Sequence, residues 1–270
     1  LLVGGALALA GAVMQGVFSN PLADPGIMGV SAGASLGAVI AIALGFTSLG
    51  MFYMPAFAFV GAFVSVGITI LLTLRNNKLD TTTLLLAGVA VSMLLGAFTS
   101  GILTMINEYR LREFLFWMVG GLDFRRWDHV LLAVGPIMTG SVILMMLGRH
   151  LNVLVLGDTE ARALGVPVMV YRMLFLFLSS VITATAVCVS GSIGFVGLVV
   201  PHIVRLLVGP DHRILLPMAA IGGALFLVFC DTLGRVVAQP VEIRVGIMTA
   251  LLGAPYFLYL LHRLRSKGGA

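Results

Sequence analysis

The chain has 270 residues, of which 60% are hydrophobic and only 10% are charged. Because soluble domains carry about 25% charged residues, this composition excludes a soluble enzyme, and the high apolar content also excludes a disordered chain. The formal net charge is +5, from 16 Lys and Arg against 11 Asp and Glu. No basic run is long enough to follow a phosphate backbone, so a nucleic-acid partner is excluded. The sequence therefore predicts an all-α polytopic membrane protein.

Nine apolar segments are expected to cross the membrane as helices. A hydrocarbon core about 30 Å thick requires about 20 apolar residues per helix. Barrel strands would alternate apolar and polar residues, whereas a stretch such as 214–230 is apolar on nearly every side. The shortest segment, 193–208, ends in Pro201, His202 and Arg205, so a broken or re-entrant helix is the alternative for it. The expected helices are 1–18, 28–47, 51–74, 82–106, 129–148, 170–190, 193–208, 214–233 and 245–263.

Basic residues in the connecting loops predict the orientation, because loops rich in Lys and Arg stay in the cytoplasm. With nine spans, one set of loops holds ten of the 16 Lys and Arg and the other set holds six. The first set is therefore expected in the cytoplasm, which puts the C-terminus inside and Leu1 outside. The ten are Arg75, Lys78, Arg149, Arg162, Arg172, Arg205, Arg213, Arg263, Arg265 and Lys267. The six are Arg110, Arg112, Arg125, Arg126, Arg235 and Arg244.

The connection 107–128, expected on the periplasmic side, is too long for a simple turn. This stretch predicts a short amphipathic helix and a loop at the membrane interface, with Trp117 and Trp127 near headgroup level. The apolar stripe of the helix is Leu111, Phe114, Leu115 and Met118.

A second long connection, 150–171, is expected on the cytoplasmic side. Asp158 or Thr159 would cap a short helix in its segment DTEARALG. Gly165 would end that helix, with Pro167 just beyond. An ordered polar element on a chain otherwise embedded in lipid indicates a contact with a partner.

Small residues allow two interpretations of one segment. Gly29, Gly33 and Gly37 form a GxxxGxxxG pattern, which favours close helix packing in lipid. The same segment matches G-x-S-x-G, the pattern of a nucleophile elbow. An intramembrane serine protease with Ser31 as nucleophile and His202 as base is therefore a competing hypothesis. The sequence has no HExxH or Walker A motif, so we expect no catalytic residue, no metal site and no ATP hydrolysis in this chain.

Polar residues beside apolar segments are costly in a membrane and mark functional or structural corners. The two prolines of QGVFSNPLADPG break the helix, and Asn20 and Asp24 can cap the breaks. Later in the chain, a histidine after a proline can bond a freed backbone carbonyl. The candidates for a translocation path or a rigid corner are Gln15, Asn20, Pro21, Pro201 and His202.

Six motifs follow one another along nearly the whole chain: QGVFSNPLADPGIMGVSAGASLGA, LLLAGVAVS, FWMVGGL, LVLGDTEARALGV, GSIGFVGLVVPHIVRLLVGPDHR and VGIMTALLGAPYFLYLL. Together they resemble the FecCD/BtuC-type permeases of ABC importers. The resemblance implies a single BtuC-like permease domain over 1–270, with about nine of the usual ten helices present. The first family helix is then expected upstream of Leu1.

The resemblance also implies partners. The permease would form a homodimer in the bacterial or archaeal cytoplasmic (inner) membrane, bind two cytoplasmic ATPases and receive its cargo from an extracytoplasmic substrate-binding protein. Family cargo is an iron-siderophore, haem, cobalamin or a similar metal complex. No cofactor is implied for this chain, because ATP and Mg²⁺ bind the partner ATPase. The expected mechanism is alternating access. An ion-coupled secondary transporter is the other alternative, but of the carboxylates only Asp231 lies near a span interior.

Family roles carry over to matching positions. The segment 151–168 resembles the coupling helices that enter a cleft on the ATPase. Arg235, in DTLGR, matches a family arginine that faces acidic residues of the binding protein, and Arg125 and Arg126 share its side by topology. FWMVGGL resembles the short outer helix beside the translocation gate. The implied coupling residues are Gly157, Asp158, Glu160, Ala161 and Gly165.

Overall fold

The computed structural model describes residues 1–74 and 79–267, and that part of the chain is helical and contains no strand. Two 3₁₀ helices, η1 (Pro25–Met28) and η2 (Phe46–Leu49), flank α2. Arg75 and Lys78, which contributed to the predicted orientation, lie outside the described residues, as do the side chains of Arg263, Arg265 and Lys267. The helices are α1 Leu2–Val17, α2 Val30–Ala43, α3 Tyr53–Thr73, α4 Thr81–Leu103, α5 Glu108–Met118, α6 Trp127–Met146, α7 Gly148–Val155, α8 Asp158–Ala163, α9 Val168–Ser190, α10 Val196–Val208, α11 His212–Val236 and α12 Val245–Lys267.

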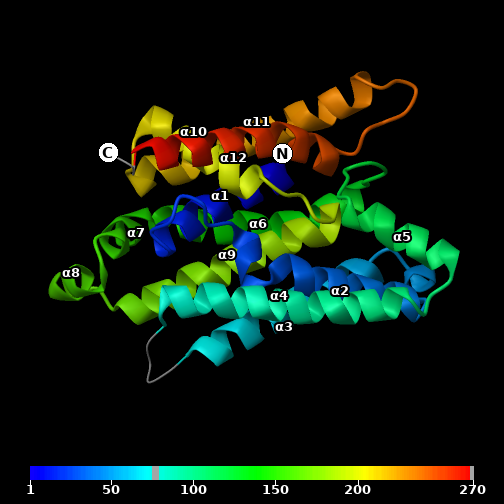
Figure 1. Ribbon diagram of the computed structural model, residues 1–270, viewed down its shortest axis with the longest axis horizontal. Coiled ribbons are helices and arrows are strands. Elements are labelled where there is room, and N and C mark those ends of the chain that lie inside the picture. Colours follow the sequence, from blue (N-terminus) through cyan, green and yellow to red (C-terminus); the bar gives the residue numbers. More distant parts are fainter. Residues whose placement is uncertain (75–78, 268–270) are drawn as a thin grey trace.

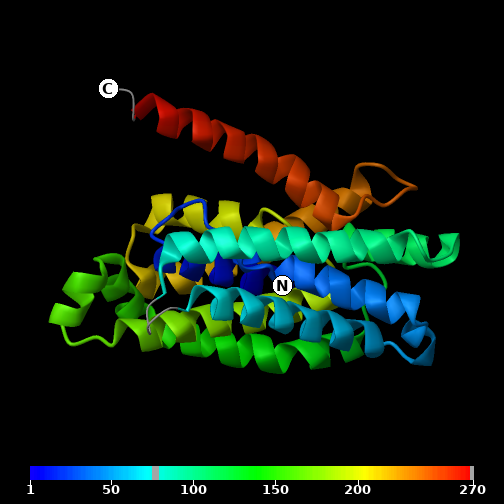
Figure 2. The ribbon, with the colours of Figure 1, turned by 60° about the horizontal axis from the view of Figure 1, so that its bottom comes forward.

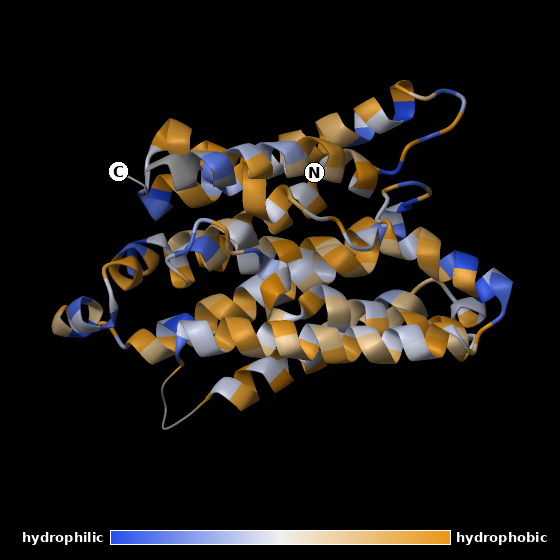
Figure 3. Cartoon of the chain, in the orientation of Figure 1, coloured by the Kyte–Doolittle hydropathy of each residue, from blue (hydrophilic) through white to orange (hydrophobic). Residues whose placement is uncertain are grey.

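Each apolar segment expected from the sequence coincides with a helix, which confirms the all-α fold class. Among the described residues, five helices are long and apolar enough to cross a membrane: α3, α4, α6, α9 and α11. The helices α1, α2 and α10 and the apolar part of α12 are shorter. Figure 3 shows hydrophobic residues along the helices and hydrophilic residues mainly in the connections at the two ends of the bundle.

Helix α10 begins later than the segment 193–208 suggested. It has 13 residues, which is a length of about 20 Å and less than the hydrocarbon thickness. The preceding residues 191–195 are non-helical, and Gly191 and Ile193 among them are buried. Non-helical backbone is tolerated at membrane depth where protein covers it. Helix α10 continues through Pro201 without a break, so the non-helical backbone precedes the helix and does not interrupt it.

Helix α1 lies at the centre of the bundle, packed against α9, α10 and α11 (Figure 1). Its residues 6–17 are all buried, as expected of a helix that is apolar all round. Glycines let its neighbours approach. A Cβ added to Gly4 would collide with the carbonyl of Gly223, and one added to Gly11 would collide with that of Gly197. Such backbone contacts replace the hydrophobic driving force that helices lack in lipid.

The predicted GxxxGxxxG contact is confirmed between α2 and α3. A Cβ on Gly33 would collide with the carbonyl of Gly61, and the reverse also holds. Gly37 lies equally close to the carbonyl of Phe57. Gly29 has a different role, because it is the N-cap of α2 with φ +82°, a conformation that favours glycine.

Several helices keep apolar faces that the rest of the chain leaves uncovered, and α4 and α12 are two of them. Helix α12 diverges from the bundle, as Figure 2 shows, and it packs mainly against α11 and α10 among the described elements. Lipid or another protein must cover these faces. The exposed apolar side chains are Ile247, Leu251, Leu252, Leu258 and Tyr259 on α12, and Leu86, Val89, Met93, Leu94 and Phe98 on α4.

The α2–α3 contact predicts opposite outcomes for two glycines of one helix. Gly61→Ala should destabilise the protein by about 1–3 kcal/mol, because the added methyl group forces the two backbones apart. Gly67→Ala, where the added Cβ meets nothing within 4 Å, should be neutral or gain up to about 1 kcal/mol of helix propensity. Thermal unfolding of the purified protein in detergent measures both. Equal midpoints for the two variants would contradict the assigned packing.

Candidate functional site

The connection between α6 and α9 holds two helices, α7 and α8, of which the sequence predicted only the second. Glycines in the left-handed region bracket α8, with φ +119° at Gly157 and +76° at Gly165. Ala161 is fully buried, whereas Thr159 and Glu160 are exposed. Helix α8, at the left end of the bundle in Figure 1, is thus anchored by a small side chain and presents a polar outer face.

The expected cap of α8 is wrong. Its N-cap is Gly157, and no side chain caps it. Asp158 is the first helical residue, and its Oδ1 lies 2.6 Å from Nη2 of Arg172 on α9. A charge-assisted bond to a guanidinium is stronger than a bond to a neutral amide, so the carboxylate turns to the cation instead of capping the helix.

Arg172 connects three parts of the chain. Its side chain is buried, and Nη1 donates to the carbonyl of Leu79 at 3.0 Å and to Oδ2 of Asp158 at 3.3 Å. Leu79 immediately precedes Asp80, the N-cap of α4. The pKa of Asp80 is lowered, chiefly because the hydroxyl and then the amide of Thr83 donate to its carboxylate. One buried cation therefore holds α8, α9 and the start of α4 together.

The sequence did not indicate this role, and Arg172 counted only among the loop charges. Its partners lie 14 and 93 residues away along the chain, so no local pattern marks them. The signal that would have found it is the position of an arginine inside the first turns of an apolar helix, where a charge requires a partner.

Three of the corner residues come together at the same end of the bundle. Gln15, Asn20 and Pro21 line a cavity of about 500 Å³ between the ends of α1, α7, α10 and α11. Gln15 is buried; its Nε2 donates to the carbonyl of Leu198 at 3.1 Å, and its Oε1 accepts from Arg205 at 2.9 Å. Gln15 therefore links α1 to α10 by polar contacts inside an otherwise apolar interface.

The predicted caps of the corner are confirmed. Asn20 Oδ1 accepts from the amide of Leu22 at 2.9 Å. Asp24 is the N-cap of η1 and accepts from the amide of Gly26 at 2.7 Å. Two local side-chain bonds therefore hold the corner between α1 and α2.

The sequence did not predict the far wall of the cavity. Asn152 of α7 donates to Asp211 at 2.7 Å and accepts from the amide of His212 at 2.9 Å. The pKa of Asp211 is lowered, chiefly because the amide of Arg213 donates to its carboxylate. These contacts tie α7 to the start of α11.

Pro201 and His202 do not line this cavity. Both lie in α10, where the ring of His202 is 6.3 Å from that of Tyr256 on α12. The bond from His202 to a freed carbonyl stays a prediction.

At the opposite end, α5 confirms the expected short helix, with a different buried face. Phe114 and Trp117 are buried, while Leu115 and Met118 of the expected stripe are exposed. The position of Trp117 at headgroup level stays a prediction. Large aromatic rings three residues apart bury more area than the aliphatic stripe, so they turn toward the bundle. Trp127 is exposed.

The glycine pair of FWMVGGL joins three helix ends. The amide of Gly121 donates to the carbonyl of Ser190 at the end of α9, at 2.8 Å. The carbonyl of Gly120 accepts from the amide of Gly246 at the start of α12, at 3.3 Å. Backbone bonds thus close the α5 end of the bundle.

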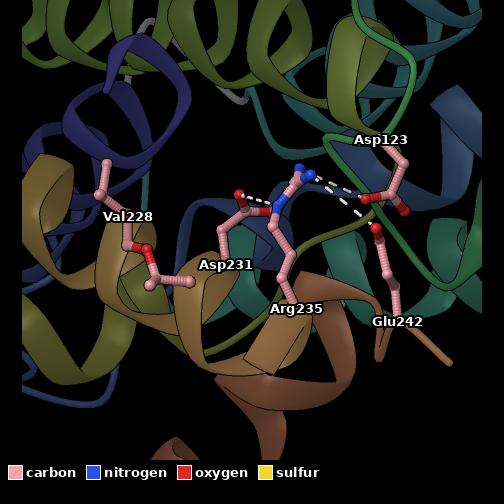
Figure 4. Close-up of polar contacts among 6 residues, drawn as sticks. Asp123, Val228, Asp231, Arg235 and Glu242 are labelled. Carbon is pink, nitrogen blue, oxygen red and sulfur yellow. Dashed lines mark hydrogen bonds and ion pairs between the residues drawn. The ribbon is translucent and has the colours of Figure 1, made fainter. Parts of the chain in front are cut away.

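Arg235, the expected docking residue, is surrounded by three carboxylates of its own chain (Figure 4). Its Nε lies 2.9 Å from Asp231 Oδ2, one turn earlier on α11. Nη2 lies 3.6 Å from Asp123 Oδ1, and Nη1 lies 3.8 Å from Glu242 Oε2. The side chain is 44% exposed, so it remains within reach of a partner.

Arg125 and Arg126 lie in the same connection as Asp123 and are exposed. Arg126 is the N-cap residue of α6, and its Nε is 3.7 Å from Asp128 Oδ2. The contact between Asp123 and Arg235 brings this connection to the end of α11. The three arginines therefore share one end of the bundle.

Neither alternative function gains support. Ser31 lies on α2, which packs mainly against α3 and α4, whereas His202 lies on α10, which packs against α1, α11 and α12. Asp231, which an ion-coupled transporter would need in a span interior, lies in the last two turns of α11 and is paired with Arg235.

Comparison with known proteins defines the class. Residues 1–263 match the FecCD transport family, and the chain belongs to that family. It is 48% identical over 260 residues to the cobalamin import system permease protein BtuC of Halobacterium salinarum, which covers 96% of this chain and 69% of that protein. It is 45% identical to the hemin transport system permease protein HmuU of Yersinia pestis, over 99% of this chain and 80% of that one.

The fold agrees with the sequence match. A solved structure of an inward-facing metal-chelate type ABC transporter superposes with a TM-score of 0.91 at 36% identity, covering 97% of this chain and 83% of that one. The chain is therefore a BtuC-like membrane permease of an ABC importer, a family that is not itself catalytic.

The buried ion pair predicts a local effect of one substitution. Arg172→Met should weaken the attachment of α8 by about 1.5–3 kcal/mol, the usual contribution of a hydrogen bond to a charged group. Amide hydrogen exchange at residues 159–164 should then accelerate by about tenfold or more.

The matched control is Arg162→Met. Arg162 lies 4.0 Å from the same Asp158, but 60% of its side chain is exposed, so its loss should leave the exchange unchanged. Equal acceleration in the two variants would show that the buried pair has no special role.

Proposed function

We propose that the chain is the permease of an importer for cobalamin, haem or a similar metal chelate. The names of its relatives support this cargo class: a cobalamin import permease, a hemin transport permease and a metal-chelate type transporter. A homodimer of the permease would bind two cytoplasmic ATPases and an extracytoplasmic binding protein. The homodimer is proposed from membership of the FecCD family, whose model matches residues 1–263.

The observation that carries the ATPase assignment is that α8 is firmly anchored to the bundle while its outer face is exposed. This helix protrudes from the bundle, yet Ala161 and the pair of Asp158 with Arg172 hold it in place. Exposed Glu160 is flanked along the chain by the exposed apolar side chains of Leu156 and Leu164. An exposed apolar patch with polar residues at its rim marks a contact with another protein. Asp158 itself serves as an anchor of the helix.

The orientation follows from this assignment. With α8 on the ATPases, the α8 end of the bundle and the C-terminus lie in the cytoplasm, and α5 lies outside. The count of basic loop residues supports the same orientation. The membrane is then the inner membrane of a bacterium or archaeon.

The mechanism is alternating access driven from outside the chain. When the partner ATPases bind ATP and Mg²⁺, the pair would close, and α8 would move with the surface that holds it. The ion pair of Asp158 and Arg172 passes this displacement to α9, and the Leu79 carbonyl passes it to the start of α4. At the α5 end of the bundle, the backbone hydrogen bonds of Gly120 and Gly121 break or form as the translocation path opens or closes. The energy comes from the different affinities of the two states for ATP.

Glu160→Arg tests the ATPase assignment. Reversing an exposed charge within an interface costs several kcal/mol, so cargo uptake into proteoliposomes should fall by about tenfold or more, while the ATPases continue to hydrolyse ATP. Glu108→Arg, a charge reversal at the exposed start of α5, is the control and should leave this coupling intact. Unchanged uptake with Glu160→Arg would remove α8 from the ATPase contact.

The cargo class is tested on the partner. The binding protein should co-purify with cobalamin, haem or another metal chelate, because cargo must bind it before reaching the permease. Absorption spectroscopy and mass spectrometry of the extracted ligand identify it. A bound sugar or amino acid would contradict the proposed class.

A further inference from the structure

The surroundings of Arg235 differ from those of a free docking residue. Asp231 accepts from its Nε at 2.9 Å and from its Nη2 at 3.5 Å, which orients the guanidinium from one turn away on the same helix. Nη2 also faces Asp123 at 3.6 Å, and Nη1 faces Glu242 at 3.8 Å. These are ion-pair distances longer than a good hydrogen bond.

The two outer carboxylates come from separate loops. Asp123 lies in the connection between α5 and α6, and Glu242 lies in residues 237–244 between α11 and α12. Neither is on the helix that carries Arg235, so each can withdraw without unwinding α11. Figure 4 shows both side chains reaching the same guanidinium from opposite segments.

We propose that Asp123 and Glu242 are competitors built into the chain, which occupy Arg235 until a carboxylate of the binding protein replaces them. The proposal deepens the docking role of Arg235 and rests on it. Loose, solvent-exposed ion pairs contribute little, whereas a partner carboxylate can bind the terminal nitrogens through two parallel short bonds. The exchange is therefore favourable on docking, but it leaves two carboxylates near the partner's acid. Their repulsion limits the affinity and lets the binding protein leave.

This competition predicts an increase in affinity where a merely structural ion pair would predict a loss. Asp123→Asn and Glu242→Gln should each tighten docking by about twofold to fivefold, the range of an exposed ion pair. The double variant should bind more tightly than either. The change should appear mainly as slower dissociation, as for most interface variants.

The experiment measures the dissociation constant and rates of the purified binding protein on the permease in lipid nanodiscs, at constant salt. Glu108→Gln removes one exposed acid of α5 away from Arg235 and is the control for a general charge effect. Arg235→Gln tests the docking role itself. Asp123→Asn in the Arg235→Gln background should leave the dissociation constant unchanged, because Asp123 then has no guanidinium to pair with.

Each outcome decides one point. Tighter binding by the two loop variants, absent in the Arg235→Gln background, supports the competition. If Arg235→Gln abolishes docking but the loop variants bind no more tightly than wild type, the competition is wrong and the docking role stands. If Arg235→Gln docks normally, the docking role fails and the competition fails with it. An equal gain with Glu108→Gln would reduce the effect to net charge and overturn the proposal.

Discussion

Close backbone approach around α1 is the constraint on which the rest of the structure depends. Lipid tails are as apolar as the helix surfaces, so helices gain little by hiding apolar area from them. In α1 the contact is made instead by glycines that lie against the carbonyls of Gly223 and Gly197. Bulky residues there would move α10 and α11 outward. The cavity beside Gln15 at one end and the Arg235 cluster at the other would then lose their geometry.

The two ends of the bundle use charge in opposite ways. At the α8 end, Arg172 is buried and makes short bonds to Asp158 and Leu79, which suits a link that transmits force. At the α5 end, Arg235 is half-exposed and shared among three carboxylates, which suits a contact that exchanges partners. The same residue type thus gives a rigid joint in one place and a replaceable contact in the other, and burial is the difference.

Much of the fold follows from the sequence, because each helix that lies in lipid must be apolar along its length and is therefore visible as an apolar segment. The segments, the short helix α5, the corner caps at Asn20 and Asp24, and the packing glycines of α2 were all predictable. The sequence did not reveal α7, because Arg149, His150 and Asn152 interrupt the apolar pattern and made this stretch part of a polar connection. It also placed the cap of α8 on Asp158 or Thr159, because the pairing of Asp158 with Arg172 on another helix leaves no local pattern. The buried face of α5 differs from the expected stripe because periodicity alone does not say which aromatic side chains face the bundle. Pairings across long separations, such as Gln15 with Arg205, need the fold itself.

The most direct test of the account is cargo uptake by proteoliposomes that contain the permease, its ATPase and its binding protein. The account predicts that uptake of the labelled metal chelate requires ATP and both partners and continues when ionophores abolish all ion gradients. Uptake that persists without the ATPase, or that stops when the gradients are removed, would contradict it.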